Sequence, residues 1–161
     1  MSRQNSFEVI TDICAQLEQV FDLARSIDLH LESAVHTGER AVAGKITGLI
    51  DDGETVMWRA KHFGIWFYLT SKIVKYDRPH FFQDVMTEGP FSEFSHEHYF
   101  KHESGITTMR DAILFKVPFG VLGDIVAPMI LTHLYRFVSQ RNLYLKQAAE
   151  SDDLGQSCLL A

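Results

Sequence analysis

Residues 93–116 read EFSHEHYFKHESGITTMRDAILFK, two alternating runs joined by a Ser-Gly turn. Successive side chains of a strand point to opposite faces. The first run therefore places two phenylalanines and two histidines on one face: Phe94, His96, His98 and Phe100. Its other face is mostly polar and charged, as expected of a face in water. The pattern predicts an antiparallel strand pair with two imidazoles on its apolar inner face, where each needs a polar partner or a ligand.

The same alternation places two carboxylates on the apolar face. Asp111 alternates with Met109 and Ile113 in the second run, and Asp84 alternates with Phe82 and a methionine in the run before residue 88. A buried carboxylate is costly unless it is paired. We therefore expect Asp84 and Asp111 to join the two histidines in one buried hydrogen-bonded group. The alternative is that one aspartate points to solvent at a β-bulge.

Three interpretations of His96 and His98 stay open. The leading one is structural, with a polar cluster that orders the cavity or one end of the sheet. The second is catalytic, because the ordinary pKa of imidazole suits a general base, although no nucleophile motif accompanies the pair. The third is a metal site completed by Asp84 or Asp111, which lacks the four converging ligands of a closed zinc site. We expect no metal and no cofactor.

Composition limits the classes of protein and partner. The chain has 161 residues, of which 46% are apolar and 22% charged, and this predicts one globular domain. Twelve phenylalanines indicate a wide aromatic interior, and the net charge of −6 makes nucleic acid and anionic membrane surfaces poor partners. No apolar run approaches the ~20 residues of a membrane span. Cys14 and Cys158 form no disulfide framework, and no signal peptide is apparent, so we expect a cytoplasmic protein.

The rest of the chain predicts a mixed architecture. Residues 7–15 alternate as a first strand, and helical spacing over residues 17–34 fits two short helices broken near residues 26–28. Short β-rich runs with turn residues then follow to Pro118, and short turns leave room only for antiparallel neighbours. A long helix follows to about Ala149. It should be kinked or restarted at Pro128, which lacks an N–H donor.

Several motifs, in order, resemble the SRPBCC (START-like, polyketide cyclase/dehydrase) superfamily, and more narrowly its small stand-alone bacterial ligand-binding members. They are Gly64, Arg78-Pro79, Phe82-x-Asp84, Gly89-Pro90-Phe91, His96-x-His98-x-Phe100, Thr107-x-Met109-x-Asp111 and Pro118 before the long helix. The resemblance covers about residues 5–146. It implies an α+β helix-grip fold, in which a curved seven-stranded antiparallel sheet wraps a long C-terminal helix and two short helices follow strand 1. We expect one domain over residues 1–150 and a disordered tail over residues 151–161, including Cys158.

Members of this superfamily enclose an apolar cavity, so the resemblance implies binding or carriage of a small hydrophobic molecule such as a lipid, isoprenoid or polyketide. Non-catalytic binding is the first expectation. The alternatives are a cyclase/dehydratase-type enzyme with a cavity histidine as general base, and an interaction module with a filled core. The oligomeric state, including a homodimer, is left open. Beside Asp84, Asp111 and the two histidines, the candidate ligand contacts are Trp58, Phe67, Phe94, Phe100, Met109, Met129 and His133.

Two further expectations concern residues at turns. Phe63 and Phe119 stand next to glycines at element ends, where they are placed to gate an opening. His62, His80 and His102 also fall near turns, and we expect their side chains to be solvated rather than functional.

Overall fold

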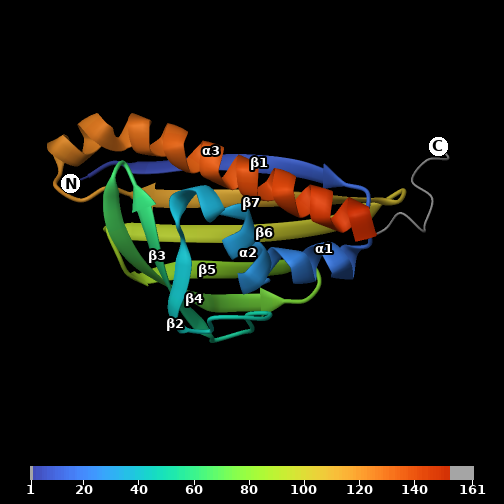
Figure 1. Cartoon of the computed structure of the whole chain (residues 1–161). Coiled ribbons are helices and arrows are strands. Elements are labelled where there is room, and N and C mark those ends of the chain that lie inside the picture. The colour runs from blue at the N-terminus through green and yellow to red at the C-terminus, as the bar shows by residue number, and fades with distance from the viewer. Residues whose placement is uncertain (1, 153–161) are drawn as a thin grey trace.

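A long C-terminal helix lies across one antiparallel sheet in the computed structural model, which describes residues 2–152 (Figure 1). The strands are β1 (Gln4–Ile13), β2 (Arg40–Gly44), β3 (Thr55–His62), β4 (Ile65–Asp77), β5 (Phe81–Glu88), β6 (Glu93–Glu103) and β7 (Ile106–Lys116). The helices are α1 (Leu17–Ala24), α2 (Ile27–Ser33), the short η1 (Val35–Thr37) and α3 (Val121–Asp152). The sheet order is β1-β7-β6-β5-β4-β3-β2, with every neighbouring pair antiparallel. The predicted helix-grip fold is confirmed.

The strand register brings the four predicted polar residues together. Asp84 on β5 pairs with His96 on β6, and His98 pairs with Asp111 on β7. The β6–β7 connection is tight because Ser104 and the following glycine both adopt positive φ, at 51° and 81°. A shift of one residue would turn every side chain to the other face, so this turn helps to fix the polar group on the inner face.

Helices α1 and α2 close one end of the concave face. The side chain of Ser26 caps α2 by accepting a hydrogen bond from the backbone N–H of Leu29 at 3.2 Å. Phe21 of α1 is fully buried, and it packs edge-to-face against Phe82 and Phe100 of the sheet. A second apolar cluster, which includes Val9, joins β1 and β7 to the middle of α3. The two clusters anchor the helices at different places along the sheet.

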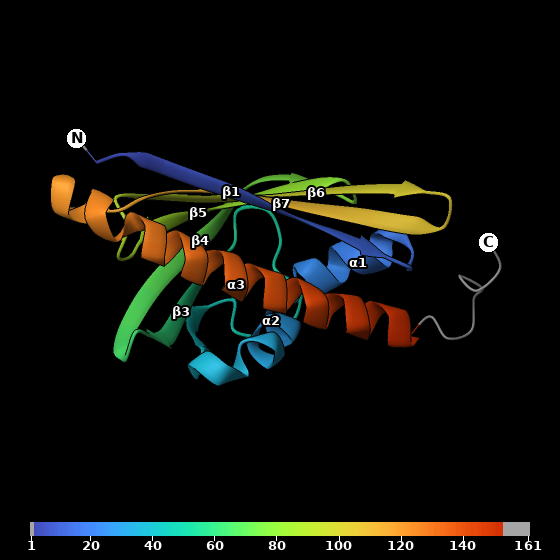
Figure 2. The ribbon, with the colours of Figure 1, turned by 90° about the horizontal axis from the view of Figure 1, so that it is seen from above.

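Helix α3 is continuous from Val121 to Asp152, and Pro128 lies inside it. Of the two expectations for Pro128, a new helical segment is therefore wrong, and a kink stays a prediction. Viewed from above, α3 runs obliquely along the sheet (Figure 2), and it packs against β1, α1 and α2. By length and composition alone, the helical segment Val121–Ser151 is long and apolar enough to span a membrane. Its most apolar 18-residue window has a mean hydropathy of 1.4, and 17% of that window is buried inside the protein. No such segment was expected from the sequence.

Two local details differ from expectation. The last helix includes Ser151 and Asp152, which were predicted to be disordered. The rest of the predicted tail, with Cys158, lies outside the described residues. Cys14, directly after β1, is disulfide-bonded, whereas no disulfide was expected.

Candidate functional site

A cavity of about 520 Å³ lies on the concave side of the sheet. Strands β3 to β7 supply its wall, α2 and the residues just before it supply one end, and the inner face of α3 covers it. Most lining side chains are apolar, and they include Ile73, Phe82, Ile113, Ile130 and Phe137. The curved sheet creates this space because α3 and the facing side chains do not fill its concave side.

Asp111 is the centre of a polar cluster in the wall of this cavity. Its side chain is fully buried, and Oδ1 accepts a hydrogen bond from Nε2 of His96 at 2.7 Å. Nδ1 of His98 lies 2.9 Å from the same oxygen, without the alignment of a hydrogen bond. The two imidazole rings stack with centroids 3.8 Å apart, and His98 also stacks on Phe82 at 4.0 Å. Asp111 and Phe82 thus hold both imidazoles in fixed orientations.

Helix α3 adds two residues to the cluster that were not anticipated from the sequence. Nδ2 of Asn142 donates to Oδ2 of Asp111 at 2.6 Å. Nη1 of Arg141 lies 3.6 Å from Oδ1 of Asp111, and its Nη2 donates to the carbonyl oxygen of Ala24 at 2.7 Å. Both side chains are buried, so Asp111 ties the sheet to the helix through polar contacts. Helix α3 carries many other polar side chains, including Arg136, Gln140 and Lys146, so nothing in the sequence singles out this pair.

The cluster shifts the pKa values of its members in different directions. Burial opposes the charge of Asp111, but His96 and His98 outweigh it and hold its pKa well below the ordinary value. Burial also opposes a charge on His98, but the carboxylates of Asp111 and Asp84 outweigh it and raise the pKa of this imidazole. Burial, helped by the charge of His98, lowers the pKa of His96. The cluster therefore shifts the pKa values of the two imidazoles in opposite directions.

A second polar group lines the cavity away from Asp111. Nδ1 of His62 and Nε2 of His133 are 2.9 Å apart, and burial lowers the pKa of both residues. Nε2 of His30 lies 3.1 Å from Oε2 of Glu39, and the His30 ring packs on Trp58 at 4.3 Å. The prediction that His62 is solvated is wrong, because the last residue of β3 still faces inward and reaches α3.

Eight of the predicted contact residues line the cavity: Trp58, Phe67, Asp84, Phe94, His96, His98, Met129 and His133. Phe100, Met109 and Asp111 do not. Phe100 and Met109 face each other across β6 and β7 and are buried in the core cluster that contains Phe21. Asp111 lies behind the two imidazoles, covered by α3. Alternation along a strand predicted the correct face for these three residues, but it gave no information on which part of that face the helices cover.

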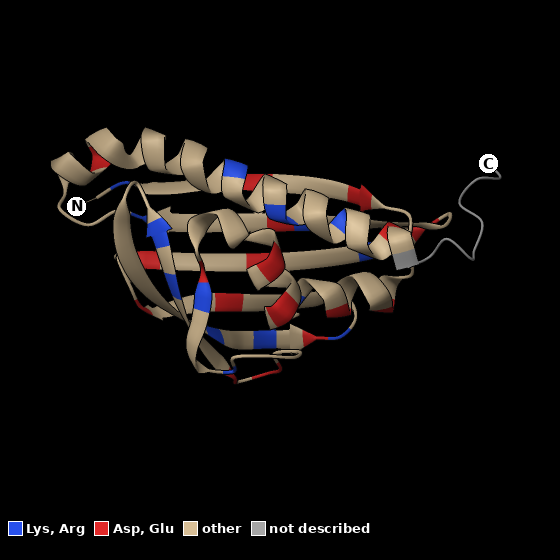
Figure 3. Cartoon of the chain, in the orientation of Figure 1, with Lys and Arg blue, Asp and Glu red and all other residues tan. Residues whose placement is uncertain are grey.

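The mouth of the cavity is marked by two exposed phenylalanines. Phe63 and Phe119 belong to the lining, although they are 52% and 82% exposed, and both have positive φ. Beside them the first turns of α3 expose Val121, Leu122 and Ile125. The sequence of these turns contains one charged residue, Asp124, and Figure 3 shows this end of α3 as mostly tan. Gating of the cavity by these two phenylalanines stays a prediction.

No protein-family model and no curated protein sequence matches the chain. Solved structures do match it over nearly its whole length. The ZhuI aromatase/cyclase from Streptomyces sp. R1128 superposes with a TM-score of 0.76 at 13% identity, covering 95% of this chain and 98% of its own. TTHA0849 from Thermus thermophilus has a TM-score of 0.75 at 14% identity, covering 92% of this chain and 99% of its own.

A plant protein shows the same likeness. The ginseng major latex-like protein 151 from Panax ginseng superposes with a TM-score of 0.68 at 13% identity, covering 91% of this chain and 97% of its own. These neighbours are Bet v1/SRPBCC proteins. At such low identity the likeness establishes the fold alone: the chain has the helix-grip fold of the SRPBCC proteins, as the sequence motifs implied.

Proposed function

We propose that this protein binds and carries a small hydrophobic molecule in the cavity between the sheet and α3. The observation that carries the proposal is the cavity itself, about 520 Å³ with a mainly apolar lining. Small-molecule sites are typically clefts of roughly 300–1,000 Å³ with a few placed polar groups. A filled interaction module is less consistent with a space of this size.

The polar groups in the cavity wall restrict the chemical class of the proposed ligand. Asp84, His96 and His98 meet the cavity on one wall, and His62 and His133 meet it on another. Oδ2 of Asp84 is buried without a hydrogen-bond partner, and a pure hydrocarbon would leave it unsatisfied, which is costly. The proposed ligand therefore has an apolar body with hydroxyl or carbonyl groups.

The test is fluorescence titration with a solvatochromic apolar dye. Ala60 is buried on β3 and lines the cavity, so Ala60→Phe should fill part of it and weaken dye binding at least tenfold. Ala112 on β7 is outside the lining, and Ala112→Phe is the matched control with unchanged binding. Equal binding by both folded variants, checked by their thermal melts, would contradict a ligand in this cavity.

One observation favours a second candidate, a cyclase/dehydratase-type enzyme. His96 lines the cavity with a lowered pKa, as a general base for an acidic C–H beside a carbonyl requires. The test is proton–deuterium exchange at the activated carbon of a 1,3-diketone probe in D₂O. Catalysis predicts exchange that is fast with wild type and lost in His96→Gln. Exchange at the buffer rate with wild-type protein would refute this candidate.

A further inference from the structure

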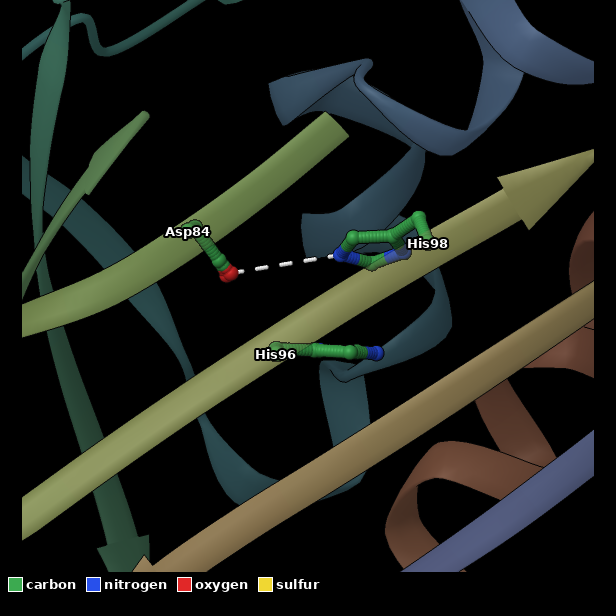
Figure 4. A group of neighbouring side chains, drawn as sticks. All are labelled: Asp84, His96 and His98. Atoms are coloured by element: carbon green, nitrogen blue, oxygen red, sulfur yellow. Dashed lines mark ion pairs between the residues drawn. The ribbon is translucent and has the colours of Figure 1, made fainter. Parts of the chain in front are cut away.

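Three side chains in the cavity wall converge on one point. Asp84 of β5 and the two histidines of β6 each offer one ligand atom, and the three atoms lie within 4.8 Å of one another. Figure 4 shows the carboxylate of Asp84 facing His98, with His96 beside them on the same strand as His98. We propose that Asp84, His96 and His98 bind a divalent transition-metal ion that faces the cavity.

Asp111 holds the two imidazoles in the orientation that such a site needs. It contacts Nε2 of His96 at 2.7 Å and approaches Nδ1 of His98 to 2.9 Å. Metal-binding histidines commonly direct their second nitrogen to a carboxylate, which fixes the ring and its tautomer. With Nε2 of His96 bonded to Asp111 and Nδ1 of His98 turned toward it, Nε2 of His98 is directed to Asp84 and Nδ1 of His96 is the atom left for coordination. Asp111 is thus a positioning residue and not a ligand.

Asp84 has an unused acceptor in this position. Its Oδ2 atom is buried, has no hydrogen-bond partner and lies 3.9 Å from Nε2 of His98. That separation is too long for a hydrogen bond. A buried carboxylate oxygen without a donor is costly, and a bound cation would remove this cost. This observation is independent of the convergence of the three residues and also points to a cation.

The donor set indicates the class of ion. Two imidazole nitrogens and one carboxylate suit Zn²⁺, Co²⁺ or Fe²⁺, whereas Ca²⁺ and Mg²⁺ prefer oxygen ligands alone. Bonds of about 2.0–2.2 Å require neighbouring ligand atoms to lie roughly 3.4 Å apart in a tetrahedron. The three atoms, which lie within 4.8 Å of one another, must therefore approach on binding. The remaining coordination position faces the cavity and admits water or an oxygen of a bound molecule.

The test is a Co²⁺ titration of protein treated with EDTA and dialysed, followed by visible absorption. We expect one equivalent of Co²⁺ to bind, with the d–d bands of a site containing nitrogen ligands, and Zn²⁺ to displace it. His98→Gln and the near-isosteric Asp84→Asn should each weaken binding at least tenfold. Asp111→Asn should weaken it about 10–100-fold, as expected for a residue that orients the ligands. His102→Gln is the control on the same strand, outside the cavity lining, with unchanged binding.

Two results would overturn the metal site. One is the absence of stoichiometric Co²⁺ binding by the folded wild-type protein. The other is equal affinity in His102→Gln, Asp84→Asn and His98→Gln when all three melt as folded proteins. Dye binding by the same EDTA-treated sample separates this inference from the proposed function, because a dye-binding protein without a metal would retain the carrier role.

Discussion

The contribution of Asp111 to stability can be worked out from its contacts. Asp111→Asn keeps the shape of the side chain but removes its charge and one acceptor. The wild-type carboxylate accepts hydrogen bonds from His96 at 2.7 Å and Asn142 at 2.6 Å, and it lies 3.6 Å from Arg141. Two hydrogen bonds to a charged group contribute about 1.5–3 kcal/mol each, and breaking a buried ion pair costs about 3–5 kcal/mol. We expect the free energy of unfolding to fall by about 3–5 kcal/mol.

Urea unfolding at neutral pH, followed by tryptophan fluorescence, measures this loss. Asp12→Asn is the control. Asp12 is an exposed aspartate on β1 that accepts a hydrogen bond from the Thr108 hydroxyl, and we expect its replacement to change the free energy of unfolding by no more than about 0.5 kcal/mol. In a double-mutant cycle with His98→Gln, the double variant should lose less than the sum of the two single losses, by about 0.5–3 kcal/mol. A loss below about 1 kcal/mol for Asp111→Asn, or strict additivity with His98→Gln, would refute the reasoning.

Three other predictions concern the cavity, the second histidine pair and a helix cap. Phe67→Ala, in the cavity lining, should increase dye uptake, whereas Phe115→Ala, buried outside it, should cost about 3–5 kcal/mol and bind no more dye. The lowered pKa values of His62 and His133 mean that the unfolded chain binds more protons below about pH 6.5. Urea unfolding should therefore show stability falling as the pH drops from about 6.5 toward the lower folded-state pKa values, less steeply in the His62→Gln/His133→Gln double variant. Ser26→Ala should lower the melting temperature through a loss of about 1 kcal/mol, and an unchanged melt would exclude a stabilising cap.

Alternation along the strands predicted more of this protein than any single motif. It placed Asp84, His96, His98 and Asp111 on one inner face, and the structure brings all four together. The reason is physical. A polar residue that shares the buried face of a strand with apolar residues cannot contact water, so it needs a hydrogen-bonding partner inside the protein.

Features that depend on how the helices lie across the sheet were not predictable in this way. Arg141 and Asn142 reach Asp111 only because of the rotation of α3, which tertiary packing sets. The cover of α1 decides that Phe100 is core and not lining. Closeness to a turn wrongly predicts exposure for His62, because the alternation of side chains along β3 still directs it inward.

Native mass spectrometry of freshly purified protein tests the central claim most directly. We expect a second species heavier by one small molecule, which organic solvent releases and which is reduced in Ala60→Phe but retained in Ala112→Phe. Released material should be apolar with hydroxyl or carbonyl oxygen. Observation of the wild-type protein only at the mass of the unliganded polypeptide, together with no binding of an apolar dye in solution, would contradict a ligand-binding cavity.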